Sequence, residues 1–170
     1  MKMNNRRTPA GAVALGGVLA ALAVVVMCLG GMIPVATYLC PVICILMLRI
    51  VLRLCGARVA WAWYGAVSLL GLLMGPDKEA AAVFLFLGYY PILKPRMDRA
   101  RLPWLWKGLL FNGAILALYW VLMHLMGMDA LVAEFSAMGT VMCLVLLALG
   151  NVVFFMLDRL LSLNFRRKKK

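Results

Sequence analysis

The chain has 170 residues, of which 66% are hydrophobic and only 14% are charged, and its mean hydropathy is +0.98. A soluble domain usually carries about 25% charged residues, so this composition excludes an ordinary soluble domain and indicates a protein embedded in a lipid bilayer. The net charge of +12 marks membrane topology rather than a nucleic-acid partner, because the basic residues flank the apolar runs.

The first two predicted helices lie in a long run without charge. Residues 8–48 include no Asp, Glu, Lys, Arg or His. As helix, at about 1.5 Å per residue, this run covers about 60 Å, twice a hydrocarbon core of about 30 Å. We therefore predict two crossings, near residues 10–32 and 41–54. Pro41 is expected in the first turn of the second helix, where its missing N–H costs little, after an irregular apolar loop over residues 30–40.

Four further helices are predicted along the chain, near residues 59–74, 80–93, 108–126 and 137–160. The fold class expected is all-α, a bundle of six transmembrane helices in one integral membrane domain over residues 1–170. Between Glu79 and Lys94 the chain supplies about 21 Å of helix, less than the hydrocarbon thickness. The fourth crossing therefore either thins the bilayer or draws its outer turn inward. A basic tail, residues 166–170, is expected in the cytoplasm.

The basic residues divide unevenly between the two sides of the predicted bundle. With six crossings, all but one of the 18 Lys and Arg residues fall on one side, and the exception is Lys78. The positive-inside rule assigns the basic side to the cytoplasm, so we expect both termini there, in the inner membrane of a bacterial cell. Four tryptophans near basic residues are expected to form an aromatic belt on that side: Trp61, Trp63, Trp104 and Trp106.

Five residues are candidates for binding a small polar solute on the outer side. Asp77, Lys78 and Glu79 form a charged turn, and charges near membrane depth usually face a partner or a water-filled cavity. A solvated turn explains them somewhat better, because a short hairpin needs a polar tip. Trp120 and His124 lie four residues apart on one helix face, where they could stack on a ligand and hydrogen-bond to it, although interfacial anchoring also explains the histidine.

Small residues recur at four-residue spacing in the first predicted helix. Ala12, Gly16 and Ala20 form one such series, and Ala10 and Ala14 form another. Small side chains let a second helix approach closely, whether that helix belongs to the same chain or to a partner. These five residues are the candidates for contact with a partner helix.

Chemistry-bearing motifs are absent from the sequence. It has no HExxH, no GxSxG and no phosphate-binding glycine loop, so we expect neither enzymatic activity nor a cofactor or metal. The cysteines are expected to be buried free thiols. Asn112 and Asn151 fall within apolar helices and are expected to hydrogen-bond between helices.

In its size, its topology and the Ala10-to-Ala14 and Ala12-to-Gly16 spacings, the chain resembles the substrate-binding S components of energy-coupling-factor transporters, which are small bacterial six-helix proteins. The resemblance implies that small residues of the first helix contact a transmembrane coupling subunit, which works with cytoplasmic ATPases. It also implies an outward pocket for a vitamin-like nutrient. Residues 75–96 are similar to small uncharacterised membrane proteins of bacteria.

The rival hypothesis is a non-catalytic scaffold of cell-envelope morphogenesis, like the cell-shape protein MreD. A scaffold needs partner faces but no ligand pocket. The two hypotheses predict different packing on the outer side of the bundle. A solute-binding protein should have a cavity there, lined by Lys78, Glu79, Trp120 or His124, whereas a scaffold should fill that space with side chains.

Overall fold

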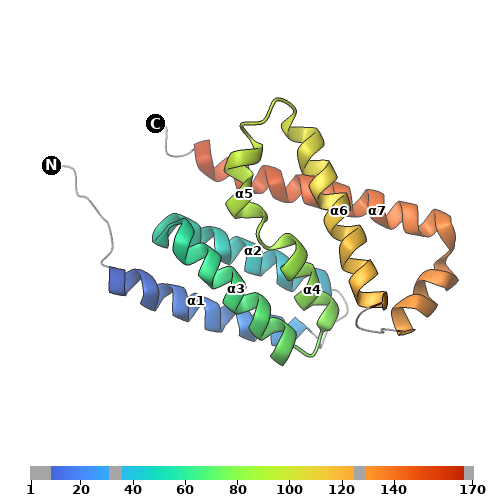
Figure 1. The fold of residues 1–170 in the computed structure, drawn as a ribbon, viewed down its shortest axis with the longest axis horizontal. Helices are drawn as coiled ribbons and strands as arrows, with labels where there is room; N and C mark the ends of the chain where they lie inside the picture. Colours follow the sequence, from blue (N-terminus) through green and yellow to red (C-terminus); the bar gives the residue numbers. More distant parts are fainter. Residues whose placement is uncertain (1–8, 31–35, 125–128, 167–170) are drawn as a thin grey trace. The chain divides into compact units, whose positions relative to one another are not determined.

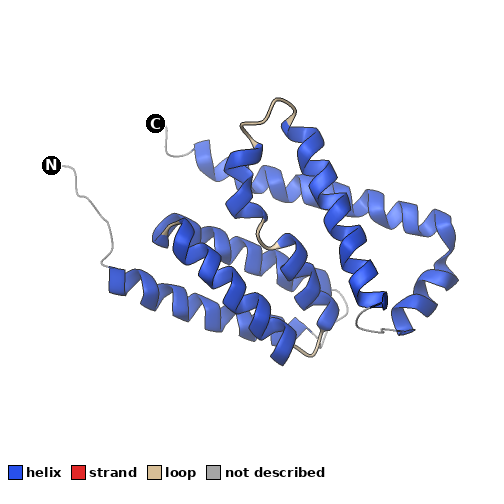
Figure 2. Cartoon of the chain, in the orientation of Figure 1, coloured by secondary structure: helices blue, strands red, loops and turns tan. Residues whose placement is uncertain are grey.

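The computed structural model describes residues 9–30, 36–124 and 129–166. Within these ranges every regular element is a helix (Figure 2), which confirms the predicted all-α fold. Figure 1 labels the helices in chain order. They are α1 (Pro9–Gly30), α2 (Ala36–Cys55), α3 (Ala57–Met74), α4 (Lys78–Leu87), α5 (Tyr90–Met97), α6 (Pro103–His124) and α7 (Asp129–Arg166).

Among the described residues, five segments are long and apolar enough to cross a membrane. They are Ala10–Leu29, Thr37–Cys55, Ala57–Met74, Pro103–His124 and Ser136–Ser162. Long apolar helices of this kind satisfy every backbone hydrogen bond within themselves, as the hydrocarbon of a bilayer requires. The chain therefore has the helices of a polytopic membrane protein.

The predicted continuous helix over residues 80–93 was wrong, because the chain breaks there into α4 and α5. The N–H of Gly88 donates to the carbonyl of Phe84 at 2.6 Å and caps the end of α4, and a Cβ added to Gly88 would overlap that carbonyl oxygen and the Phe84 ring. Pro91 has no N–H to continue the hydrogen-bond ladder beyond this point. With 10 residues, α4 rises only about 15 Å, half of a hydrocarbon core.

The start of α2 also differs from the prediction. The helix begins at Ala36, so Pro41 lies inside it rather than in its first turn, and the irregular loop is shorter than expected. The reason is that the first turn is held from outside. The hydroxyl of Thr37 donates a hydrogen bond to Asp77, just before α4, and the hydroxyl of Tyr38 donates one to Glu79, in the first turn of α4. Residues 31–35 of the predicted loop lie outside the described residues.

The chain forms two compact units, residues 1–95 and 96–170. In the first unit α1 and α2 pack antiparallel. The thiol of Cys55 donates to the carbonyl of Ala12 at 3.3 Å, and that of Cys44 donates to the carbonyl of Ala23 at 3.6 Å. The side chains that fill this unit have no exposed surface; they include Ala23, Cys44, Leu48, Val51, Ala60, Val67, Ala80 and Phe84.

One residue of the predicted aromatic belt belongs to this core instead. Trp63 is only 4% exposed and packs edge-on against Phe84, with ring centroids 6.3 Å apart. It lies on the inner face of α3 with Ala60 and Val67, three residues before it and four after it, which are also buried. The belt prediction was therefore wrong for Trp63, whereas Trp61 is exposed.

In the second unit, α6 begins at Pro103 rather than near residue 108, because proline is favoured in the first turn of a helix. The following helix, α7, is longer than the predicted 137–160 and is interrupted at Gly139, where φ is 71° and ψ is 163°. A side chain strains a backbone in that conformation, so glycine permits the bend that Figure 1 shows in α7. Of the predicted basic tail, residues 167–170 lie outside the described residues.

Candidate functional site

The charged turn before α4 connects three helices through its side chains. Asp77 is the N-cap of α4: its Oδ1 accepts from the N–H of Ala80 at 3.0 Å, and its Oδ2 accepts from the hydroxyl of Thr37 at 2.6 Å. The ammonium of Lys78 donates to the carbonyl of Leu72 at 2.7 Å, in the last turn of α3. This carbonyl has no partner within its own helix, so Lys78 satisfies a group that the helix end leaves open.

The third residue of the turn has a partner in α2. The Oε1 atom of Glu79 accepts a hydrogen bond from the phenol of Tyr38 at 2.9 Å. Together with the contact between Thr37 and Asp77, this bond fixes the first turn of α2 against the start of α4. The local geometry of the turn is therefore that of a structural junction.

Removing the cap from α4 is expected to destabilise the first unit. Asp77→Ala should lower the free energy of unfolding by about 1 kcal/mol, because it loses the bond to the helix N–H, whereas Asp77→Asn keeps an acceptor there. Unfolding by SDS in mixed micelles, followed by circular dichroism, measures the difference. Equal stability of the Ala and Asn variants would show that the cap contributes nothing.

Trp120 and His124 lie in the second unit and stack on each other. Their ring centroids are 5.4 Å apart with planes 15° apart, and the Nδ1 atom of His124 lies 3.2 Å from the carbonyl oxygen of Trp120. Both side chains are exposed, Trp120 at 62%. Their outward position near the end of an apolar helix fits interfacial anchoring as well as ligand contact.

The five predicted solute-binding residues are therefore divided between the two units. Asp77, Lys78 and Glu79 belong to residues 1–95, and Trp120 and His124 belong to residues 96–170. Their joint action on one ligand stays a prediction. A shallow depression lies on α7, and the described residues that line it are Asn151, Val152, Phe155, Met156 and Arg159.

The small residues of α1 are divided between two faces of the helix. Gly16 is buried, and a Cβ added to it would lie 3.5 Å from Val59 of α3. Ala12 and Ala20 are half-buried on the same side, so these three residues pack within the first unit. The other two candidates are exposed: Ala10 and Ala14.

Ala10 and Ala14 belong to a longer exposed series of small residues on α1. Gly17 and Ala21 continue it, at spacings of three and four residues, and both are exposed. A Cβ added to Gly17 would meet nothing within 4 Å. We call Ala10, Ala14, Gly17 and Ala21 the outer ridge of α1.

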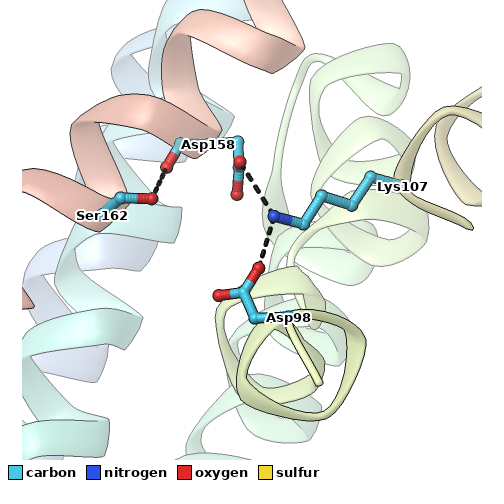
Figure 3. A network of polar contacts seen from close by, with 4 residues as sticks. All are labelled: Asp98, Lys107, Asp158 and Ser162. Atoms are coloured by element: carbon cyan, nitrogen blue, oxygen red, sulfur yellow. Dashed lines mark hydrogen bonds and ion pairs between the residues drawn. The ribbon is translucent and has the colours of Figure 1, made fainter. Parts of the chain in front are cut away.

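Lys107, which precedes the helix predicted near residues 108–126, lies in α6 and is buried at the centre of an ion-pair triad (Figure 3). Its Nζ atom is 2.5 Å from Oδ1 of Asp98 and 3.0 Å from Oδ2 of Asp158, and the hydroxyl of Ser162 donates to the carbonyl of Asp158 at 2.8 Å. Lys107 and Asp158 are 51 residues apart, so no local pattern predicts their contact. The only hint was that both acids lie among the basic residues of one side.

The two asparagines join α6 to α7, as predicted. Asn112 donates to the side-chain oxygen of Asn151 at 3.1 Å, and Asn151 donates back to that of Asn112 at 3.0 Å. Each amide also donates to the carbonyl four residues earlier in its own helix. Beside them the rings of Phe111 and Phe154 stack with centroids 4.7 Å apart. These contacts confirm that the asparagines pair the helices.

Known proteins give no guide to this arrangement. The chain matches no protein-family model, no curated protein and no solved structure. The function has to be inferred from the residues themselves.

Metal binding has no visible basis in the described part of the chain. No three residues among its His, Cys, Asp and Glu gather where they could hold one ion. All five cysteines are free thiols; Cys40 and Cys44 are buried in α2 as expected, whereas Cys28, Cys55 and Cys143 are only half-buried.

Proposed function

We propose that this protein is a non-catalytic, membrane-embedded component of a larger membrane complex and that it contacts its partner through the outer ridge of α1. The proposal rests on the four small residues of the outer ridge, which are exposed along one face of α1. The opposite face of α1 packs against α2 and α3. Without large side chains in the way, a second helix can approach the backbone closely and gain dispersion contacts. The alternating spacings of four and three residues suit a partner that crosses at a shallow angle.

The more specific form of this proposal is a substrate-binding component of a small-solute uptake transporter. Its partner is then a transmembrane coupling subunit with cytoplasmic ATPases, and its solute is a vitamin-like nutrient. The resemblance to S components and the exposure of Ala10 and Ala14 support this form. It keeps both termini in the cytoplasm of a bacterial cell. For that topology α4 and α5 must complete a sixth crossing together, over Lys78–Met97.

A scaffold of cell-envelope morphogenesis is the second candidate, and one observation favours it. Asp77, Lys78 and Glu79 each use polar atoms to hold α2, α3 and α4 in place. These contacts make the junction between the helices rigid. A scaffold needs such rigidity to present its faces to partners, and it needs no ligand at this turn.

The partner is identified by affinity purification of the tagged chain in mild detergent, followed by mass spectrometry of co-purifying proteins and small molecules. A coupling subunit with ATPases supports the transporter form. Cell-wall or division proteins alone support the scaffold.

Gly17→Leu is expected to abolish recovery of the partner without unfolding the chain, because the new side chain enters open space but raises the outer ridge. Leu22→Phe is the matched control, since it adds bulk to an exposed position of α1 about 100° away from the ridge. Quantitative mass spectrometry of the purified samples compares the two. Equal recovery with Gly17→Leu and wild type would contradict the proposed contact.

A further inference from the structure

The ion-pair triad brings together two segments that each carry an exposed arginine. Arg99 follows Asp98 in the chain, and Arg159 follows Asp158. Both carboxylates lie within 3.0 Å of the Lys107 ammonium (Figure 3), so each arginine is the next residue after a partner of the same ammonium. The pair between Lys107 and Asp158 is largely buried and therefore costly to break, so it holds the segment of Arg159 in place, whereas Asp98 is 45% exposed and adds a weaker contact beside Arg99.

This end of the unit carries an excess of positive charge. Residues 96–107 and 158–159 together hold five basic and two acidic side chains, and both acids contact the same ammonium. The four arginines among them are exposed: Arg96, Arg99, Arg101 and Arg159. An anion is the complementary ligand for such a surface.

The aromatic residues that follow identify the depth of this surface. Trp104 is 67% exposed and Trp106 is 58% exposed, in the first turn of α6 directly after the arginines. Exposed tryptophan next to arginine on an apolar helix is typical of the headgroup level of a bilayer. The anion available there in quantity is the phosphate of a phospholipid.

The depression on α7 supplies the apolar part of such a ligand site. It extends along the helix from Asn151 to Arg159, and between these ends its lining is apolar: Val152, Phe155 and Met156. Its volume is about 370 Å³, within the range of small-molecule sites. A shallow apolar depression that ends at a guanidinium matches an acyl chain that ends at a phosphate.

We infer that this surface is a binding site for an anionic phospholipid of the surrounding bilayer. The phosphate binds Arg99 and Arg159, and one acyl chain lies in the depression along α7. Lys107 and its two carboxylates do not contact the lipid; they hold the two arginines in position.

Native mass spectrometry of the full chain in non-ionic detergent tests the inference, with phosphatidylglycerol and phosphatidylcholine added in equal amounts. Wild-type protein should retain phosphatidylglycerol in preference. The double variant Arg99→Gln and Arg159→Gln should bind it roughly 30-fold more weakly, since each basic residue near an anionic surface contributes about fivefold in affinity. Replacing both arginines by lysine should keep most of the preference, because the charge remains.

Two further variants separate a built site from diffuse surface charge. Arg53→Gln with Arg58→Gln removes two exposed charges from the first unit and should leave the preference unchanged. Met156→Trp fills the depression from a position that is 68% exposed, and it should weaken retention while the chain stays folded. The inference is overturned if the wild type shows no preference, if the Arg99 and Arg159 double variant keeps it, or if the control pair loses as much.

Discussion

Lys107→Met is expected to lower the free energy of unfolding by about 3 kcal/mol or more, the largest loss for any single change in the second unit. The side chain of Lys107 is 9% exposed and that of Asp158 is 15% exposed, so the substitution leaves a carboxylate in a place that water reaches poorly. Asp98 is 45% exposed and is solvated without the lysine, so Asp98→Asn should cost less than about 1 kcal/mol. Unfolding in mixed micelles of SDS and a mild detergent measures each change.

A double variant distinguishes an ion pair from mere packing at this position. Lys107→Met combined with Asp158→Leu should be more stable than Lys107→Met alone, because no unpaired charge remains buried. If instead the two losses simply add, the contact with Asp158 contributes no coupling and the triad does not hold α6 to α7.

Gly88→Ala is expected to destabilise the first unit by about 1–3 kcal/mol. The new Cβ would overlap the carbonyl oxygen and the ring of Phe84, and the ring is fully buried and cannot move aside. The turn between α4 and α5 must therefore open.

Gly65→Ala is the matched control for Gly88→Ala. Gly65 lies in α3, and a Cβ there would meet nothing within 4 Å, so the same substitution should stabilise the helix by up to about 1 kcal/mol. Thermal unfolding in detergent, followed by circular dichroism, compares both variants with wild type. Similar shifts in Tm for the two would mean that the break between α4 and α5 does not depend on glycine.

The long helices could be predicted from the sequence because their cause is local. The run without charge over residues 8–48 and the length that a bilayer demands were enough for α1 and for most of α2. The pairing of Asn112 with Asn151 followed from the cost of an amide in an apolar helix. The absence of charged residues was enough to predict the helices, and the presence of an asparagine in an apolar helix was enough to predict the contact.

The early start of α2 and the burial of Lys107 could not be predicted because they depend on contacts distant in sequence. The early start of α2 needs Thr37 to meet Asp77, 40 residues away. The burial of Lys107 needs an acid from α7, and its charge pointed instead to a loop. The turn at Gly88 was hidden because its apolar neighbours continue the pattern of a helix.

The residues of the charged turn and of the small-residue series on α1 could be named from the sequence, but their contacts and exposure could not. The turn from Asp77 to Glu79 was correctly placed at the start of a helix, yet its polar atoms are used to connect helices. For α1 the four-residue spacing was correctly noted, but helix geometry places Ala12 and Ala14 on different faces, and only burial shows which face stays open.

The central claim, that α1 contacts a partner protein through its outer ridge, is tested most directly by photo-crosslinking in cells. A photoreactive amino acid at Ala14 or at Gly17 should yield a protein adduct of one defined mass, identified by mass spectrometry, while the same probe at Leu22 should yield none or far less. Lipid adducts alone at all three positions would contradict the claim and make the outer ridge a surface that faces the bilayer.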